Sequence, residues 1–216
     1  MQKLSVQECL SFGWRTFRSR PGIFVSATAV LFLLGMLINL PSDFVTPDSS
    51  TSVQLYGAFA SILALVLSFF LIMGKTAFYL HAHDDAEGAT LRNLWHPHPY
   101  WKFVGAAFLA GLATIIGLIL LIIPGIIIGI IVSFSLYLVI EKELGPVAAI
   151  RESAQLTKGN RWKLFLLGLA LLGINIIGFC LLLVGLLVTL PISTLSVVHA
   201  YRTLSKARVS GPEAVA

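Results

Sequence analysis

The side chains best suited to chemistry lie in one short polar stretch, where histidines stand among carboxylates. The candidate ligands are His81, His83, Asp84, Asp85, Glu87, His96 and His98. Imidazoles and carboxylates together can bind a divalent cation, and two histidines at i and i+2 can converge in an extended segment. The spacing matches no established zinc motif, however. We therefore expect a hydrated loop without a metal or cofactor, and keep a metal site at His81, His83, Asp84 and Asp85 as the alternative.

The rest of the chain offers little that indicates catalysis. It contains no glycine-rich phosphate-binding loop and no nucleophile elbow. Its two cysteines, Cys9 and Cys180, are far apart and have neither a disulfide framework nor metal-type spacing. We predict that the protein is not an enzyme. A membrane-embedded enzyme acting on lipids would have to use the polar stretch at residues 81–98.

The amino-acid composition indicates that most of the chain is surrounded by lipid and not by water. Apolar residues make up 57% of the chain and charged residues 12%, about half the charged share of a soluble domain. The mean hydropathy is +0.90, and so little charge cannot cover the surface of a soluble fold. The net charge of +5 is compatible with nucleic-acid binding, but the basic residues flank apolar stretches. We therefore expect a membrane protein that binds no nucleic acid.

Six apolar stretches separate the polar segments. They cover residues 22–40, 57–79, 103–123, 125–140, 164–184 and 186–204. A helix needs roughly 20 apolar residues to cross the hydrocarbon core, and the stretches lack the period-two polarity of barrel strands. We predict an all-α integral membrane domain over residues 1–206, in which six transmembrane helices form three hairpins and the first helix is not cleaved. For residues 207–216 we expect a disordered tail.

The basic residues are confined to alternate connections. All fifteen lysines and arginines lie in the segments 1–21, 75–102, 141–163 and 202–208. The connection at 41–56 and the turns near Pro124 and Gly185 carry none. Because cytoplasmic loops carry the excess of lysine and arginine, this pattern predicts a multi-pass protein of the cytoplasmic membrane with both termini inside. An odd number of spans would destroy the segregation.

A polar or amphipathic segment precedes each hairpin. Helices are predicted at 5–18 and 146–158, whereas Pro97 and Pro99 interrupt the middle segment. We expect the two helices to lie flat at the headgroups, with plain connectors as the alternative. Basic and tryptophan side chains near the boundary would then bind anionic membrane lipids. The candidates are Arg15, Arg18, Arg20, Trp101, Lys158, Arg161, Trp162 and Lys163.

Most polar side chains inside the spans are uncharged, and Lys75 lies near the basic-side end of the second span. No acidic residue lies within a predicted span, which argues against a proton or cation pathway. Asn175 lies in the middle of the fifth span, and serines or threonines occur in the other spans. We expect these groups to hydrogen-bond between helices, with Asn175 as the main buried polar candidate.

The chain also contains an internal repeat. Trp101-Lys102 opens the third span as Trp162-Lys163 opens the fifth, and Ile115-Ile116-Gly117 then superimposes on Ile176-Ile177-Gly178. The repeated unit is a boundary segment followed by a helical hairpin, used three times in parallel orientation.

One set of residues carries a resemblance. It comprises Leu121-Ile122-Ile123-Pro124-Gly125, Ala149-Ile150, Ser153, Leu156-Thr157-Lys158-Gly159-Asn160, Trp162-Lys163-Leu164-Phe165, Pro191 and Ala200-Tyr201-Arg202. In these residues the chain resembles a family of uncharacterised bacterial six-helix membrane proteins, similar to the membrane domain of some glycerophosphoryl diester phosphodiesterases. The resemblance implies architecture and no activity, because the phosphodiesterase barrel has no counterpart in this sequence.

Two functions of different class fit these expectations. The leading hypothesis is a non-enzymatic membrane protein that interacts with lipids, or binds a membrane-protein partner or a second copy of itself. The alternative is a small transporter or exporter of a hydrophobic or lipid-like substrate. Internal repeats and helices interrupted by Pro124, Gly185 and Pro191 favour this alternative, because transporters share such features.

Overall fold

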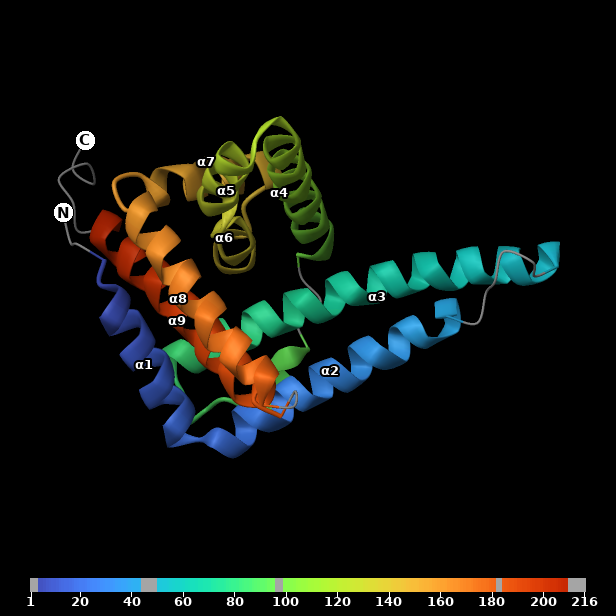
Figure 1. Ribbon diagram of the computed structural model, residues 1–216, viewed down its shortest axis with the longest axis horizontal. Coiled ribbons are helices and arrows are strands. Elements are labelled where there is room, and N and C mark those ends of the chain that lie inside the picture. Colours follow the sequence, from blue (N-terminus) through green and yellow to red (C-terminus); the bar gives the residue numbers. More distant parts are fainter. Residues whose placement is uncertain (1–3, 44–49, 96–98, 182–183, 210–216) are drawn as a thin grey trace.

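The computed structural model describes residues 4–43, 50–95, 99–181 and 184–209. Within these ranges every regular element is helical, which confirms the predicted all-α class (Figure 1). The elements are α1 (Val6–Ser19), α2 (Pro21–Asp43), α3 (Thr51–Asp84), the 3-10 helix η1 (Leu91–Leu94), α4 (Tyr100–Leu120), α5 (Ile122–Val132), α6 (Ser135–Lys142), α7 (Pro146–Thr157), α8 (Arg161–Cys180) and α9 (Leu186–Val209).

Three pairs of consecutive helices pack side by side as hairpins. They are α2 with α3, α4 with α5, and α8 with α9. In Figure 1 the α2–α3 hairpin extends to the right, α4 and α5 stand at the top, and α8 and α9 cross the lower left. Because the three hairpins point in different directions, the arrangement of six spans in one bilayer remains a prediction from the charge distribution.

Five helical segments in the described ranges are long and apolar enough to cross a membrane. They are Pro21–Ile38, Thr51–Asp84, Tyr100–Leu120, Ile122–Lys142 and Arg161–Cys180. The sixth predicted span, 186–204, is helical as part of α9 but is not among them. It is less apolar than the other five, because Pro191, His199 and Arg202 interrupt its apolar residues. Its residues Ile192, Ser196 and Tyr201 are buried against protein. A helix covered by other helices does not need an apolar surface on every side.

The fourth predicted span, 125–140, is divided into α5 and α6. The break at Ser133 and Phe134 leaves backbone groups that a continuous helix would satisfy. Ser153 of α7 satisfies two of them, because its Oγ donates to the Ile131 carbonyl oxygen at 2.6 Å and accepts from the Phe134 N–H at 3.2 Å. The predicted helix at 146–158 corresponds to α7, and Gly159, with φ 83°, ends it.

The buried core lies at the end of the hairpins that carries the basic residues. It includes Phe24 of α2, Phe78 of α3, Leu138 of α6, Ala149 of α7 and Leu195 of α9. We call this part the base: α1, α6 and α7, together with the basic-side ends of α2, α3, α4, α8 and α9. The remaining halves of the hairpins expose large apolar side chains along their length, as helices in contact with lipid do.

The predicted helix at 5–18 corresponds to α1, which packs along α9. Ser5 caps it by accepting the Glu8 N–H at 3.4 Å, and Cys9, Gly13 and Phe17 form its buried face. A Cβ added at Gly13 would lie 2.7 Å from the Ile192 carbonyl oxygen. This position therefore requires glycine, and the opposite face of α1 exposes Trp14, Arg15 and Arg18.

Candidate functional site

The described histidines and carboxylates of the polar stretch are not placed to share a metal ion. His81, His83 and Asp84 lie in the last turn of α3, where residues at i and i+2 face different sides, so the extended geometry that a site requires is absent. Asp85 instead accepts the backbone N–H groups of Glu87 and Gly88, at 3.1 and 2.9 Å. Across the described ranges, no three His, Cys, Asp or Glu side chains are placed to share a metal ion. His96 and His98 lie outside these ranges.

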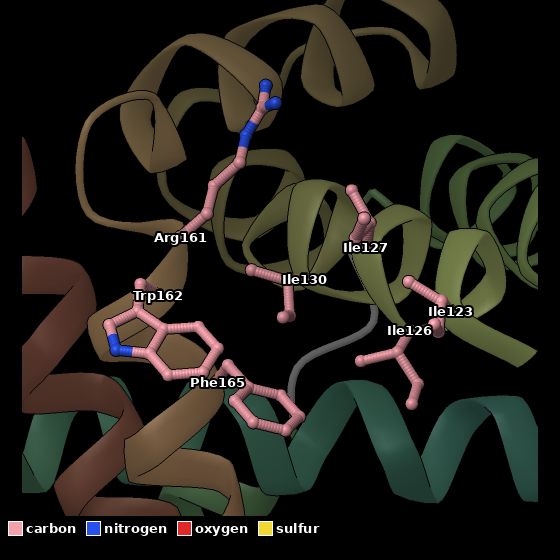
Figure 2. Close-up of a pocket in the computed structure, with 7 residues that line it drawn as sticks. All are labelled: Ile123, Ile126, Ile127, Ile130, Arg161, Trp162 and Phe165. Atoms are coloured by element: carbon pink, nitrogen blue, oxygen red, sulfur yellow. The ribbon is translucent and has the colours of Figure 1, made fainter.

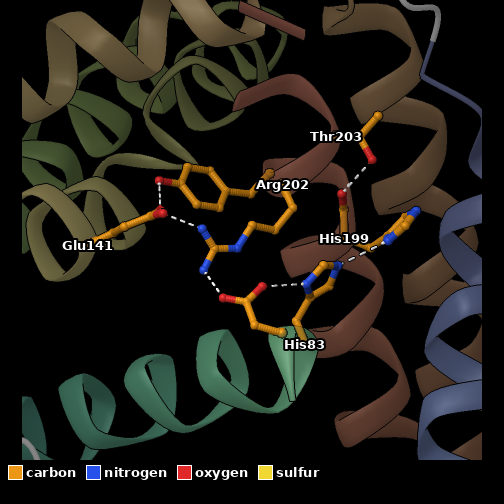
Figure 3. A network of polar contacts seen from close by, with 7 residues as sticks. His83, Glu141, His199, Arg202 and Thr203 are labelled. Atoms are coloured by element: carbon orange, nitrogen blue, oxygen red, sulfur yellow. Dashed lines mark hydrogen bonds and ion pairs between the residues drawn. The ribbon is translucent and has the colours of Figure 1, made fainter. Parts of the chain in front are cut away.

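Part of the stretch belongs to a polar network at the centre of the base (Figure 3). Arg202 of α9 forms ion pairs with Asp84 of α3 and Glu141 of α6. The Tyr201 hydroxyl donates a hydrogen bond to the second oxygen of Glu141. We call Asp84, Glu141, Tyr201 and Arg202 the inner polar cluster, and it connects three helices that are distant in sequence.

Two histidines extend the inner polar cluster towards α1. His83 Nδ1 lies 3.0 Å from Asp84 Oδ1, and His83 Nε2 lies 3.2 Å from His199 Nδ1. The ring of Phe12 on α1 stacks on His199 with 4.1 Å between centroids. The network therefore joins α1, α3, α6 and α9, and its first role is to hold the base together.

A pocket of about 320 Å³ adjoins the cluster. His81, Asp84, Asn93, Trp95, Glu141 and Arg202 are among its lining residues. Both carboxylates in this pocket are already paired with Arg202, whose buried Nε has no hydrogen-bond partner among the described residues. The pocket therefore offers little free charge to a ligand.

The inner polar cluster was not predicted, although the sequence contains a signal for it. Asp84, Glu141 and Arg202 each stand near the basic-side end of the chain segment that returns from a predicted hairpin. Charges of opposite sign at equivalent depth are expected to pair where the helix ends meet. The resemblance alone drew attention to Tyr201 and Arg202, and only as structural residues.

Tryptophan side chains mark the outside of the base. All four tryptophans of the chain are exposed: Trp14 at 51%, Trp95 at 72%, Trp101 at 81% and Trp162 at 70%. Three of them have a basic neighbour in sequence, namely Arg15, Lys102 and Arg161. Exposed indole beside a cation is typical of the boundary between lipid and water.

The predicted headgroup-binding residues lie at three separate places on the base. Arg15 and Arg18 are exposed on α1, whereas the Arg20 guanidinium donates to the Glu87 carbonyl oxygen. Trp101 projects from the start of α4. The structure brings together one larger group, which lies at the turn from α7 into α8 and consists of Lys158, Arg161, Trp162 and Lys163.

Two adjoining cavities lie between α5 and α8, next to this group. The first, of about 560 Å³, is lined by Ile123, Ile126, Ile127, Ile130, Arg161, Trp162 and Phe165 (Figure 2). The second, of about 260 Å³, reaches α9 and shares Ile126 and Ile130 with the first. We call the two together the α5–α8 groove. Its size is in the range of ligand sites, which run from about 300 to 1,000 Å³.

Asn175 joins α8 to α9, as the sequence predicts for a buried polar residue. Its Nδ2 donates to Ser193 Oγ at 2.9 Å and to the Leu171 carbonyl oxygen at 2.9 Å. Its Oδ1 is buried without a partner among the described residues. Asn175 lines neither the α5–α8 groove nor the pocket beside the inner polar cluster, so its contacts are those of a packing residue.

Comparison with known proteins finds relatives without an assigned role. Residues 104–208 match a family described as protein of unknown function (DUF975). The uncharacterised protein Rv2560 of Mycobacterium tuberculosis is 25% identical over 228 residues, which cover 95% of this chain and 70% of that protein. The uncharacterised protein Mb2590 of Mycobacterium bovis is similar to the same extent. No solved structure matches the chain. These findings agree with a resemblance to uncharacterised bacterial proteins, and none bears on the phosphodiesterase membrane domain.

Proposed function

We propose that the protein is a non-enzymatic, multi-pass component of the cytoplasmic membrane whose base lies in the inner headgroup layer and interacts with anionic lipid. In this proposal six helices cross the bilayer as three hairpins, and both termini are cytoplasmic. The exposure of Trp14, Trp101 and Trp162 on the base, each beside a basic residue, is the observation that carries it.

The physical argument concerns where indole and guanidinium groups are stable together. Indole rings favour the headgroup layer, where the ring meets apolar groups and the N–H meets water. Basic residues near an anionic membrane surface each gain about 1 kcal/mol. Trp14 with Arg15, Trp101 with Lys102, and Trp162 with Arg161 combine both preferences.

Two groups of basic residues on the base can be compared, those without a hydrogen-bond or ion-pair partner among the described residues and those paired with a carboxylate. Arg15 and Arg18 of α1 make no hydrogen bond or ion pair with another described residue, whereas Lys142 and Arg208 are paired with Glu152, at 3.4 and 3.1 Å. Unpaired cations are available to lipid phosphates. Paired ones already have a carboxylate partner.

Reconstitution in nanodiscs tests the proposal. Spin-labelled phosphatidylglycerol should be enriched at the protein boundary relative to spin-labelled phosphatidylcholine. The double variant Arg15→Gln/Arg18→Gln should lower this enrichment by up to about tenfold. Lys142→Gln/Arg208→Gln removes the same charge from paired positions and should change it much less. Equal enrichment of both lipids around the unmodified protein would refute the proposal.

A small exporter of a lipid-like substrate is the second candidate. The α5–α8 groove favours it, because its volume suits a hydrophobic ligand. Fluorescent phospholipid in proteoliposomes distinguishes the two, since an exporter moves the label between leaflets and exposes it to an external quencher. The leading proposal predicts quenching at the rate of protein-free liposomes.

A further inference from the structure

We propose that the α5–α8 groove binds one molecule of anionic phospholipid, with its phosphate on Arg161 and its acyl chains in the two cavities. This inference rests on the proposed function, because it assumes that the base lies at the inner leaflet. It adds a defined binding site and a chemical class of ligand to the general attraction of lipid by the base.

The interior of the groove is suited to hydrocarbon. Four isoleucines of α5 face Trp162 and Phe165 of α8 across the first cavity (Figure 2). The second cavity continues between α5, α8 and α9, with Leu164, Leu167 and Leu171 in its wall. Ile126 and Ile130 line both cavities, so the cavities lie side by side. The two acyl chains of one diacyl lipid also lie side by side.

Arg161 supplies the charge at one end of the groove. In Figure 2 its side chain leaves the start of α8 and carries the guanidinium away from the isoleucines. Among the described residues it makes no hydrogen bond or ion pair, whereas Arg202 and Arg208 are paired with carboxylates. A guanidinium can bind two oxygens of one phosphate through parallel hydrogen bonds. The groove therefore has an apolar interior that can hold acyl chains and, at one end, an unpaired cation that can bind the phosphate of the same phospholipid.

The lining residues also select the headgroup charge. Neither cavity is lined by an aspartate or a glutamate. A zwitterionic headgroup would bring an ammonium group that finds no carboxylate there. Charge complementarity therefore favours an anionic headgroup such as phosphatidylglycerol.

Two glycines keep the second cavity open. Gly129 of α5 and Gly168 of α8 both line it. A Cβ added at Gly168 would have no heavy atom within 4 Å, and the same holds for Gly173, which does not line the groove. Gly168→Leu would therefore fill the cavity without a clash at Cβ, and Gly173→Leu is a matched control on the same helix.

Native mass spectrometry tests the site. The protein is reconstituted with phosphatidylethanolamine and phosphatidylglycerol, extracted in mild detergent and examined for retained lipid. The unmodified protein should retain one phosphatidylglycerol. Arg161→Gln should reduce its retention about tenfold and abolish the preference for phosphatidylglycerol. Gly168→Leu should lose the lipid, and Gly173→Leu should keep it.

Several results would overturn the site while leaving the proposed function intact. The first is an unmodified protein that retains no phospholipid, and the second is equal retention in the Gly168→Leu and Gly173→Leu variants. The third is a dimer that dissociates in Gly168→Leu, which would show that the groove binds a second copy of the chain and not lipid. In each case the boundary enrichment of spin-labelled phosphatidylglycerol reports on the proposed function separately. Ile127→Trp fills the first cavity from an exposed position and repeats the test if Gly168→Leu does not fold.

Discussion

Arg202 of α9 forms an ion pair with Asp84 of α3, although 118 positions separate them in the sequence. The same guanidinium pairs with Glu141 of α6. Its side chain is 17% exposed, whereas the side chains of Glu141 and Asp84 are 29% and 50% exposed, so Glu141 is the more covered of its two partners. These ion pairs join α3, α6 and α9 in the base.

Loss of this pairing should destabilise the fold. Arg202→Gln should lower the free energy of unfolding by about 2 kcal/mol, because the partly covered Glu141 would keep its desolvation cost without its charged partner. Arg208→Gln, on the same helix, removes an exposed pair with Glu152 and should cost less than about 1 kcal/mol. Denaturation in mixed micelles measures both, and equal losses would contradict a central role for Arg202.

The Asn175–Ser193 hydrogen bond should make only a modest contribution. Asn175→Leu should cost about 1 kcal/mol or less, because the variant loses one interhelical bond but also removes the unpartnered Oδ1. A double-mutant cycle with Ser193→Ala isolates the pair, and we expect a coupling energy of about 1 kcal/mol. A coupling energy of zero would show that the two side chains do not meet in the membrane.

The buried thiol of Cys9 reports on the docking of α1. Burial raises the pKa of Cys9 from 9.0 to about 11, with a smaller contribution from the nearby charge of Glu8. At pH 8 the thiolate is therefore scarce, and alkylation of Cys9 should be slow in the folded protein. The raised pKa stabilises docking fully below pH 9, and this contribution is lost as the pH rises from 9 towards 11.

Gly13→Leu should release this thiol. The added side chain would collide with the Ile192 backbone and separate α1 from α9. The rate of Cys9 alkylation at pH 8 should then rise at least about tenfold towards that of a free thiol. Gly22→Leu is the control, because a Cβ there has open space. An unchanged rate in Gly13→Leu would show that α1 is not held on α9 by this contact.

Periodicity and charge predicted the local structure of this chain well, because both are properties of neighbouring residues. The helices α1 and α7 and the five long apolar helical segments follow from apolar length and from signals such as Pro146 and Gly159. Residues 207–209 of the predicted tail are helical, because α9 continues to Val209, and residues 210–216 lie outside the described ranges. The described ranges do not test the repeat or the flat orientation of α1 and α7.

The features that were not predicted depend on contacts distant in sequence. The break between α5 and α6 requires Ser153 of another helix to satisfy the open backbone. The α5–α8 groove depends on the distance between two helices, which no local pattern encodes. The extended geometry assumed for His81 and His83 was wrong, because α3 continues as a helix through Asp84.

Topology is the central claim, and cysteine labelling in intact cells tests it directly. In a Cys9→Ala/Cys180→Ala background, Ser50→Cys stands at the start of α3 near the tip of the first hairpin, and Ser11→Cys stands exposed on α1 in the base. A membrane-impermeant maleimide should modify the cysteine at position 50 in intact cells and the cysteine at position 11 only after permeabilisation. The reverse pattern, or labelling of both positions from outside, would contradict a base that lies on the cytoplasmic side.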